Sequence, residues 1–201
     1  MDPKAQPLFR SFMSKEIVLI GRSNVGKSTL FRELTGRNVR IGRRPGVTIS
    51  PTKVLIGDVI YVDMPGYGFM SGVSAPQQKK TKDFIIRYFE ENAENLLLII
   101  EVIDASAFME IANRWEKRGR IPLEVELYEF LCELGPPVVI GANKMDKVSD
   151  PDETLDEICA TLGMLPPWRQ WINEIAPICA KRGDTYPLLK TIREKIQSTS
   201  R

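Results

Sequence analysis

A glycine-rich segment near the N-terminus has the residue types and spacing of a phosphate-binding loop. It fits G-x-x-x-x-G-K-[ST], in which backbone N–H groups surround the β- and γ-phosphates of a nucleotide. Lys27 would add a positive charge, and the Ser28 hydroxyl can ligate Mg²⁺. The motif alone does not choose between ATP and GTP. The residues expected to surround the phosphates are Gly21, Arg22, Ser23, Asn24, Val25, Gly26, Lys27, Ser28 and Thr29.

A second motif supplies a carboxylate and a glycine. Asp63, Met64, Pro65 and Gly66 follow an apolar run, where a Walker-B carboxylate is expected. Asp63 would bind Mg²⁺ through water, and the Gly66 N–H would contact the γ-phosphate. The alternative is an ordinary Asx-Pro-Gly turn. The position after a phosphate-binding loop favours the nucleotide interpretation.

A threonine between these two motifs completes the predicted magnesium site. Gly46 and Val47 lead into Thr48, which is our candidate for the second protein ligand of Mg²⁺, with Ser28 as the first. The alternative is a loop threonine exposed to solvent. We therefore predict Lys27, Thr48 and Gly66 as catalytic residues.

The base is predicted to be guanine. Asn143, Lys144, Met145 and Asp146 follow another apolar run, and an aspartate there can accept from both N1–H and the exocyclic amine of guanine. Adenine lacks this donor pair and would leave the carboxylate unpaired, which disfavours an ATPase or nucleotide kinase. Asn143 would brace the neighbouring loops. A last base loop is predicted at Cys179, Ala180 and Lys181, where the Ala180 N–H would donate to guanine O6.

The composition is that of a globular chain of 201 residues with a net charge of +2. No histidine is present, so Cys/His metal sites and a histidine general base are excluded. The three cysteines are expected to be reduced and buried or half-buried. No apolar run is long enough to span a membrane and no signal peptide is evident, so the expected location is the cytoplasm.

The predicted strands and helices alternate, which indicates an α/β fold with an open sheet. Together with the motifs above, this predicts a three-layer α/β/α P-loop NTPase of the Ras-like G-domain type. We expect a six-stranded, mostly parallel sheet with one antiparallel strand, because Gly57-Asp58 between two apolar runs signals a hairpin. The expected strands are 17–21, 50–56, 59–63, 96–103, 138–142 and 175–179. The expected helices are 27–34, 77–92, 108–117, 123–134, 153–162 and 186–197.

With these motifs in place, the chain resembles the EngB family of translation-factor-class P-loop GTPases. The similarity rests on the loop at 21–29, Arg44-Pro-Gly-Val-Thr48 and Asp63-Met-Pro-Gly-Tyr-Gly68, and runs over about residues 15–196. Arg114–Pro122 and Asn143–Asp146 are similar to archaeal members. The resemblance implies a monomeric GTPase that binds a large ribosomal subunit or its rRNA, with a role in cell division and septation. It also implies an N-terminal extension (1–14), one G domain (15–197) and a short tail (198–201).

Hydrolysis is expected to be slow, because Tyr67 stands where Ras-like enzymes place a water-positioning glutamine. The resembled group implies a compensating device, in which an asparagine at the place of Asn24 holds K⁺ against the phosphates. The alternative is an asparagine that only stabilises the loop.

Two basic stretches are candidates for contact with RNA phosphates. The segment 36–56 contains five basic residues and no acidic one, and a second stretch includes Arg114, Lys117, Arg118 and Arg120. Solvated charges remain the alternative for both. A nucleotide-stabilised RNA-binding module with incidental hydrolysis is therefore a second functional hypothesis beside the switch.

Overall fold

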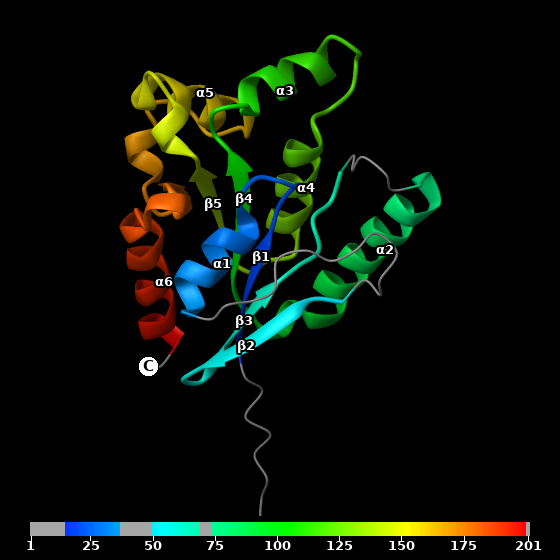
Figure 1. Ribbon diagram of the computed structural model, residues 1–201, viewed down its shortest axis with the longest axis vertical. Coiled ribbons are helices and arrows are strands. Elements are labelled where there is room, and N and C mark those ends of the chain that lie inside the picture. Colours follow the sequence, from blue (N-terminus) through cyan, green and yellow to red (C-terminus); the bar gives the residue numbers. More distant parts are fainter. Residues whose placement is uncertain (1–14, 37–49, 69–73, 200–201) are drawn as a thin grey trace, which may run out of the picture.

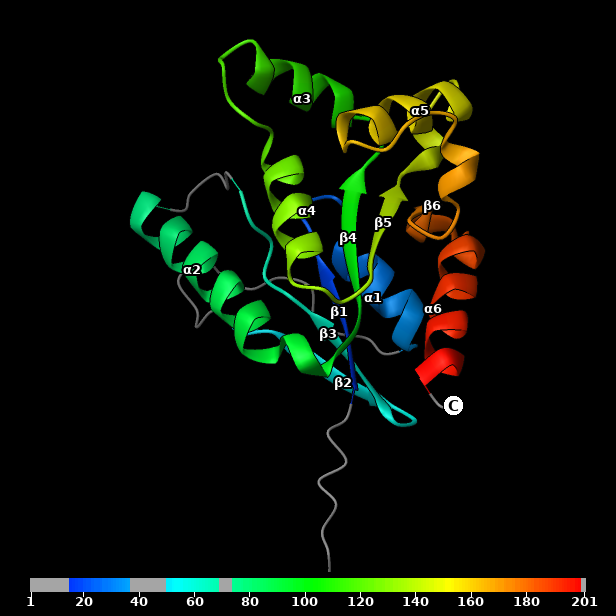
Figure 2. The same ribbon diagram turned by 180° about the vertical axis from the view of Figure 1, so that it is seen from behind.

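A six-stranded sheet with helices on both faces forms the framework of the computed structural model (Figures 1 and 2). The structure describes residues 15–36, 50–68 and 74–199. The sheet has the order β2-β3-β1-β4-β5-β6. Its strands are β1 (Lys15–Ile20), β2 (Thr52–Ile56), β3 (Val59–Asp63), β4 (Leu96–Asp104), β5 (Val138–Asn143) and β6 (Ile175–Pro177). Among the strands of the described residues, only β2 is antiparallel to its neighbour, since it is joined to β3 by the turn at Gly57-Asp58. This confirms the predicted fold class.

Six α-helices lie within the described residues, in the order that the sequence predicts. Their bounds are α1 (Lys27–Thr35), α2 (Ala75–Asn92), α3 (Phe108–Glu116), α4 (Leu123–Glu133), α5 (Pro151–Thr161) and α6 (Tyr186–Thr199). Two residues explain why α5 begins where it does. The Asp150 side chain accepts a hydrogen bond from the Glu153 N–H at 3.0 Å, and Pro151 occupies the first turn. The predicted helices α2 and α5 began two residues too late.

The core lies on both faces of the sheet because the central strands are buried on both sides. In β1, Ile17 and Leu19 pack toward α1 and α6, whereas Val18 and Ile20 pack toward α2 and α4. Figure 1 shows α1 in front of the sheet, and Figure 2 shows α4 in front of it from the other side. Helices α3 and α5 share a third apolar cluster at the β5 and β6 side.

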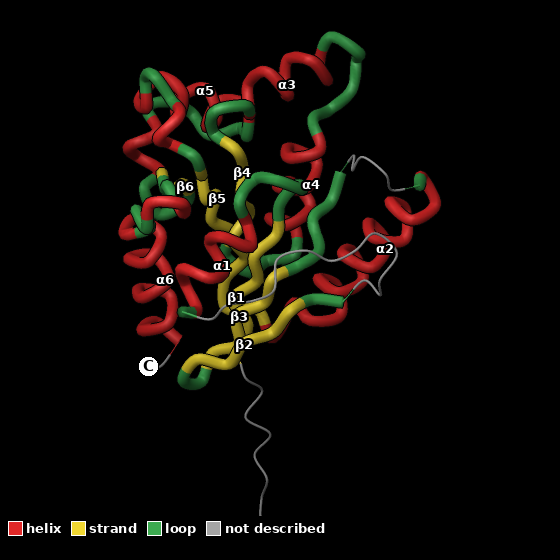
Figure 3. The backbone as a smooth tube through the Cα atoms, in the orientation of Figure 1, coloured by secondary structure: helices red, strands yellow, loops and turns green. Residues whose placement is uncertain are grey.

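The carboxyl ends of the parallel strands bring the predicted motifs together. The loops that follow β1, β4 and β5 lie at one end of the sheet (Figure 3). The motif at residues 63–66 belongs to the same end, because β3 runs parallel to β1 and Leu19 pairs with Asp63. In open α/β sheets this edge is where ligands bind.

All three cysteines are free. Cys159 and Cys179 are buried, but Cys132 on α4 is exposed, so the expectation of a buried or half-buried thiol was wrong there. Within residues 15–36, 50–68 and 74–199, no helix combines the length and the apolar character that crossing a membrane requires.

Candidate nucleotide-binding site

The loop after β1 wraps tightly, and two glycines make this possible. A Cβ at Gly21 would come within 2.3 Å of the Val102 carbonyl oxygen. Gly26 has φ +95°, and a Cβ there would lie 2.3 Å from Asn143 Nδ2. Helix α1 begins directly after Gly26, with no side-chain cap and no acidic residue in its first turn. Its free N–H groups and positive dipole end therefore favour an anion at this loop.

Asp63 at the end of β3 joins the two polar side chains that open α1. The Lys27 ammonium donates to Asp63 Oδ1 at 2.6 Å, and the Ser28 hydroxyl donates to Asp63 Oδ2 at 3.0 Å. Lys27 and Asp63 are 7% and 8% exposed, so this pair is largely shielded from water. The structure thus brings together the predicted phosphate-binding cation and two predicted magnesium ligands. The third, Thr48, lies with Gly46 and Val47 outside the described residues.

The segment after Asp63 is hydrogen-bonded to the phosphate-binding loop. Ser23 N–H donates to the Tyr67 carbonyl at 3.3 Å, and Tyr67 N–H donates to the Gly21 carbonyl at 3.4 Å. A Cβ on Gly66 would lie 2.8 Å from Ser23 Oγ and 3.2 Å from the Ser23 backbone, so a larger residue would push these two segments apart. Met64 differs from its neighbours, since it is 1% exposed and packs in the core.

Asn143 at the end of β5 fastens two loops to each other. Its Nδ2 donates to the Val25 carbonyl at 2.8 Å, and its Oδ1 accepts from the Ala180 N–H at 3.0 Å. The bracing predicted for Asn143 is therefore present. The Ala180 N–H was predicted to donate to guanine O6, whereas here it donates to Asn143 Oδ1.

Lys144 links the base motif to the phosphate-binding loop. It has φ +66°, and its ammonium donates to the Asn24 carbonyl at 2.8 Å and to Asp104 Oδ2 at 2.5 Å. Asp104 ends β4 and was not singled out in the sequence. The sequence feature that could have identified it is a carboxylate at the end of an apolar run, the same feature that identified Asp63.

The Asp146 carboxylate is held in its charged form. A hydrogen bond from the Cys179 thiol lowers its pKa below the usual range, and the Arg182 guanidinium, 3.6 Å away, lowers it further. A carboxylate that stays ionised is what recognition of two guanine donors requires. Sequence reasoning missed Arg182, although it follows directly on the predicted base loop.

A second polar cluster lies behind the phosphate-binding loop. The Tyr67 hydroxyl donates to Glu101 Oε1 at 3.0 Å, and Arg22 pairs with Glu124 at 3.1 Å. Glu101 in β4 is 0% exposed, and its Oε2 has no hydrogen-bond partner among the described residues. Burial raises the pKa of Glu101 well above its ordinary value, and the Glu124 charge raises it further, so this carboxyl is held neutral.

This second cluster changes the interpretation of two predicted residues. The Arg22 guanidinium is turned toward α4 and Glu124, so only its backbone belongs to the loop that faces the phosphates. The Tyr67 phenol is bonded to a buried acid, and its pKa is raised, first by burial and also by its hydrogen bond to Glu101. The sequence signal for the cluster was Glu101, a charged residue inside an otherwise apolar strand.

Comparisons with known proteins agree with this geometry. Residues 16–144 match the family described as 50S ribosome-binding GTPase. A protein of Archaeoglobus fulgidus named probable GTP-binding protein EngB is 48% identical over 184 residues, which cover 92% of this chain and 93% of the relative. A crystal structure titled as a probable GTP-binding protein engB is 41% identical with a TM-score of 0.84, covering 91% of this chain and 99% of that one.

A more distant structure concerns an RNA complex. The chain is similar to Era in complex with MgGDPNP and nucleotides 1506–1542 of 16S ribosomal RNA, with 27% identity and a TM-score of 0.61. The match covers 90% of this chain and 56% of that one.

Proposed function

The chain belongs to the EngB family of GTP-binding GTPases, and on that premise we propose that it is a magnesium-dependent switch acting on a large ribosomal subunit. The observation that carries the proposal is the geometry around Asp63. Its two oxygens bind Lys27 and Ser28, while Gly66, three residues further on, abuts the phosphate-binding loop at Ser23. One short segment thus senses both the metal site and the terminal phosphate.

The residues present fit a magnesium ion. Ser28 Oγ and Asp63 Oδ2 lie 3.0 Å apart, and hard oxygen donors of this kind are those that Mg²⁺ takes together with phosphate oxygens. Ser28, Asp63 and Thr48 would hold the ion. When bound, Mg²⁺ neutralises charge on the β- and γ-phosphates. Lys27 adds its own positive charge at the same phosphates, and nucleotide binding requires it to exchange its bond to Asp63 for bonds to phosphate oxygens.

The switching element is the segment from Asp63 to Tyr67. A γ-phosphate offers an acceptor to the Gly66 N–H, and the two hydrogen bonds between Tyr67 and the phosphate-binding loop couple that contact to the loop's position. A diphosphate lacks this acceptor. The two nucleotide states would therefore present different surfaces around Gly66, and we propose that one of them binds the ribosomal particle in the cytoplasm. We also propose that the protein is required for cell division and septation.

Asn24 is proposed to hold K⁺ during hydrolysis. The residue is exposed and has φ +70°, a left-handed conformation that asparagine tolerates better than most residues. Asn24→Gly removes the side chain and still permits this left-handed backbone. We expect it to abolish acceleration of GTP hydrolysis by K⁺ over Na⁺ while GDP affinity stays within twofold. Acceleration that survives in Asn24→Gly would restrict Asn24 to shaping the loop.

Guanine selection by Asp146 has a direct test. Fluorescent GDP, ADP and xanthosine diphosphate are compared on the wild type and on Asp146→Asn. We expect the wild type to prefer GDP, and the variant to shift toward xanthosine diphosphate, because an amide can donate to the oxygen that replaces the exocyclic amine. Comparable binding of GDP and ADP, unmoved by the substitution, would reduce residues 143–146 to a surface loop.

The switch itself is tested by co-sedimentation with purified archaeal large ribosomal subunits. The protein is incubated with GDPNP, with GDP or with neither, in the presence of Mg²⁺. We expect at least tenfold more protein in the pellet with one nucleotide than with the other. Equal co-sedimentation in both states would favour an RNA-binding module whose hydrolysis is incidental, and absence of binding in every state would reject the ribosomal partner.

A further inference from the structure

A cavity of about 780 Å³ lies on the face of the molecule that carries α2, α3 and α4, next to the segment after β3. Its floor is aliphatic and aromatic. Gly66, Tyr67 and Gly68 form one wall, so the cavity adjoins the proposed switching element. The apolar side chains of the floor are Ile85, Ile86, Leu123, Leu127 and Phe130.

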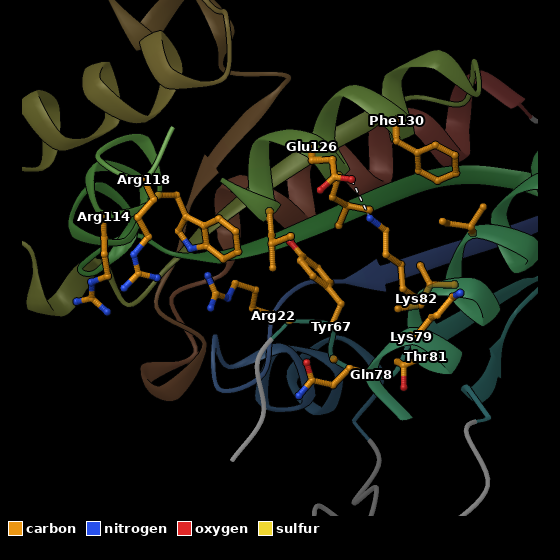
Figure 4. Close-up of a pocket in the computed structure, with 17 residues that line it drawn as sticks. Arg22, Tyr67, Gln78, Lys79, Thr81, Lys82, Arg114, Arg118, Glu126 and Phe130 are labelled. Atoms are coloured by element: carbon orange, nitrogen blue, oxygen red, sulfur yellow. Dashed lines mark hydrogen bonds and ion pairs between the residues drawn. The ribbon is translucent and has the colours of Figure 1, made fainter. Parts of the chain in front are cut away.

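The border of this cavity is positively charged. Figure 4 shows Arg114 and Arg118 at one end and Lys79 and Lys82 at the other, with Arg22 and Tyr67 between them. Three of the cations have partners: Lys82 pairs with Glu126, Arg22 with Glu124 and Arg114 with Glu110. Lys79 and Arg118 make no ion pair with any described residue. The cavity therefore offers unneutralised charge from two different helical segments, one on each side of an apolar floor.

An aromatic side chain stands beside the arginines. Trp115 is half-buried and lines the cavity, although its sequence context gave it no role. The turn after it is well fixed: the Trp115 carbonyl accepts from the N–H groups of Arg118 at 2.9 Å and Arg120 at 3.1 Å. Gly119 supplies the left-handed φ of +63° that closes this turn. Trp115 and Arg118 are consequently presented by a rigid helix end rather than by a loose surface loop.

We propose that this cavity binds single-stranded RNA, with a base packed against Trp115 and the apolar floor and with backbone phosphates on Arg118 and Lys79. Unpaired cations that flank an aromatic and apolar surface are the combination that single-stranded nucleic acids use, since each base has an apolar face and each linkage carries a negative charge. An acidic peptide would satisfy the cations but has no need of a stacking surface. The inference rests on the proposed function, because it names the RNA surface of the same switch.

The cavity and the nucleotide site share one wall. Tyr67 contributes its side chain to the cavity, while its backbone is bonded to Gly21 and Ser23 of the phosphate-binding loop. An RNA segment in the cavity thus touches the segment that senses the γ-phosphate. RNA affinity should differ between the GDPNP and GDP forms, and by reciprocity RNA should change the affinity for these nucleotides by the same factor.

The test uses a fluorescein-labelled uridine 12-mer and the full-length protein loaded with GDPNP or with GDP. Trp115→Ala and Arg118→Ala are compared with Lys117→Ala and Arg120→Ala, which remove neighbouring positive charges that do not line the cavity. We expect a loss of affinity of about tenfold for each cavity variant in the better-binding state, and less than about twofold for each control. Equal losses in all four variants would indicate unspecific attraction to a basic surface and would overturn the proposal.

The contribution of the base is measured with an abasic 12-mer and with poly-L-glutamate. The wild type should bind the abasic strand about tenfold more weakly than the uridine strand, and Trp115→Ala should erase this difference. Poly-L-glutamate that binds as tightly as the uridine strand, with the same dependence on Arg118, would instead assign the cavity to an acidic protein segment. Trp168 and Trp171 remain in Trp115→Ala, so this variant still has tryptophan fluorescence. RNA should quench the tryptophan fluorescence of the wild type and leave that of Trp115→Ala unchanged.

GDPNP and GDP affinities of the same variants separate this inference from the proposed function. Neither Trp115 nor Arg118 contacts the residues at 21–29, 63–66 or 143–146 through any hydrogen bond or ion pair of the described structure, so both affinities should stay within twofold of the wild type in the absence of RNA. A wild-type protein that binds both nucleotides normally but does not bind the uridine 12-mer would overturn the RNA site alone. A wild-type protein that binds neither GDPNP nor GDP would overturn the switch.

Discussion

Two buried carboxylates, Asp63 on β3 and Glu101 on β4, lie on the strands that flank β1, and their surroundings differ. Asp63 has a partner for each oxygen, an ammonium and a hydroxyl, and both partners are groups that can exchange to phosphate or metal. Glu101 has one phenol and an orphan oxygen in the apolar interior, and it is held neutral by burial. The two lie on either side of the phosphate-binding loop.

The difference separates residues that exchange ligands from residues that hold the loop in place. A buried ion pair can be opened when a ligand supplies replacement charges, as phosphates and Mg²⁺ do. A neutral acid bonded to a phenol has no such exchange partner, so it fixes the segment that carries Tyr67. We infer that Asp63 belongs to the nucleotide cycle and that Glu101 belongs to the support behind it.

The largest effect is expected from Lys27→Ala. It removes the cation of the exchangeable pair and leaves both Asp63 and the phosphates without it. Affinity for GTP should fall on the order of a thousandfold, or about 4 kcal/mol. Fluorescent nucleotide titration measures this. Lys53→Ala is the matched control. Lys53 lies on β2, away from the loop, and also pairs with a buried carboxylate, that of Glu16 on β1. A loss below tenfold would show that Lys27 serves mainly to neutralise Asp63.

The sequence predicted the region around Asp63 better than the region around Glu101, and the reason is chemical. The exchangeable residues have to occupy the ends of parallel strands at fixed spacing, so Lys27, Ser28, Asp63 and Asn143 were identified from motifs, and the helices and strands from periodicity. Glu101, Glu124 and Asp104 could not be assigned partners, because their contacts cross between elements far apart in the chain. The direction of the Arg22 side chain was missed for the same reason.

A substantial stability effect is expected from Arg22→Ala. The substitution leaves Glu124, which is 4% exposed, without the Arg22 guanidinium with which it forms its ion pair. The free energy of unfolding should fall by about 3 kcal/mol, as when one member of a buried ion pair is removed. Urea denaturation measures this. The double variant Arg22→Met, Glu124→Leu should recover most of the loss, and a double variant as unstable as the single one would contradict the pair as the cause.

Glu101→Gln should have an effect that grows with pH. The folded state keeps the Glu101 proton above the ordinary pKa of 4.5, so it binds more protons than the unfolded chain and the wild type loses stability as pH rises. Glutamine does not titrate. The stability of Glu101→Gln relative to the wild type should therefore rise between pH 5 and pH 8, by at most about 1.4 kcal/mol per pH unit. Exposed Glu90→Gln is the control, and a difference independent of pH would mean that Glu101 is charged.

The smallest effect is expected from Tyr67→Phe, and it decides on which side of the comparison Tyr67 stands. The variant removes only the hydrogen bond to Glu101, whose net value is about 1 kcal/mol in urea denaturation. Tyr61→Phe is a matched control, since the Tyr61 hydroxyl makes no hydrogen bond with the described residues. If Tyr67 is support, the intrinsic rate of GTP hydrolysis in single-turnover measurements stays within twofold of the wild type. A tenfold fall in this rate without a matching loss of stability would place the phenol at the attacking water. Tyr67 would then act in hydrolysis rather than hold the loop in place.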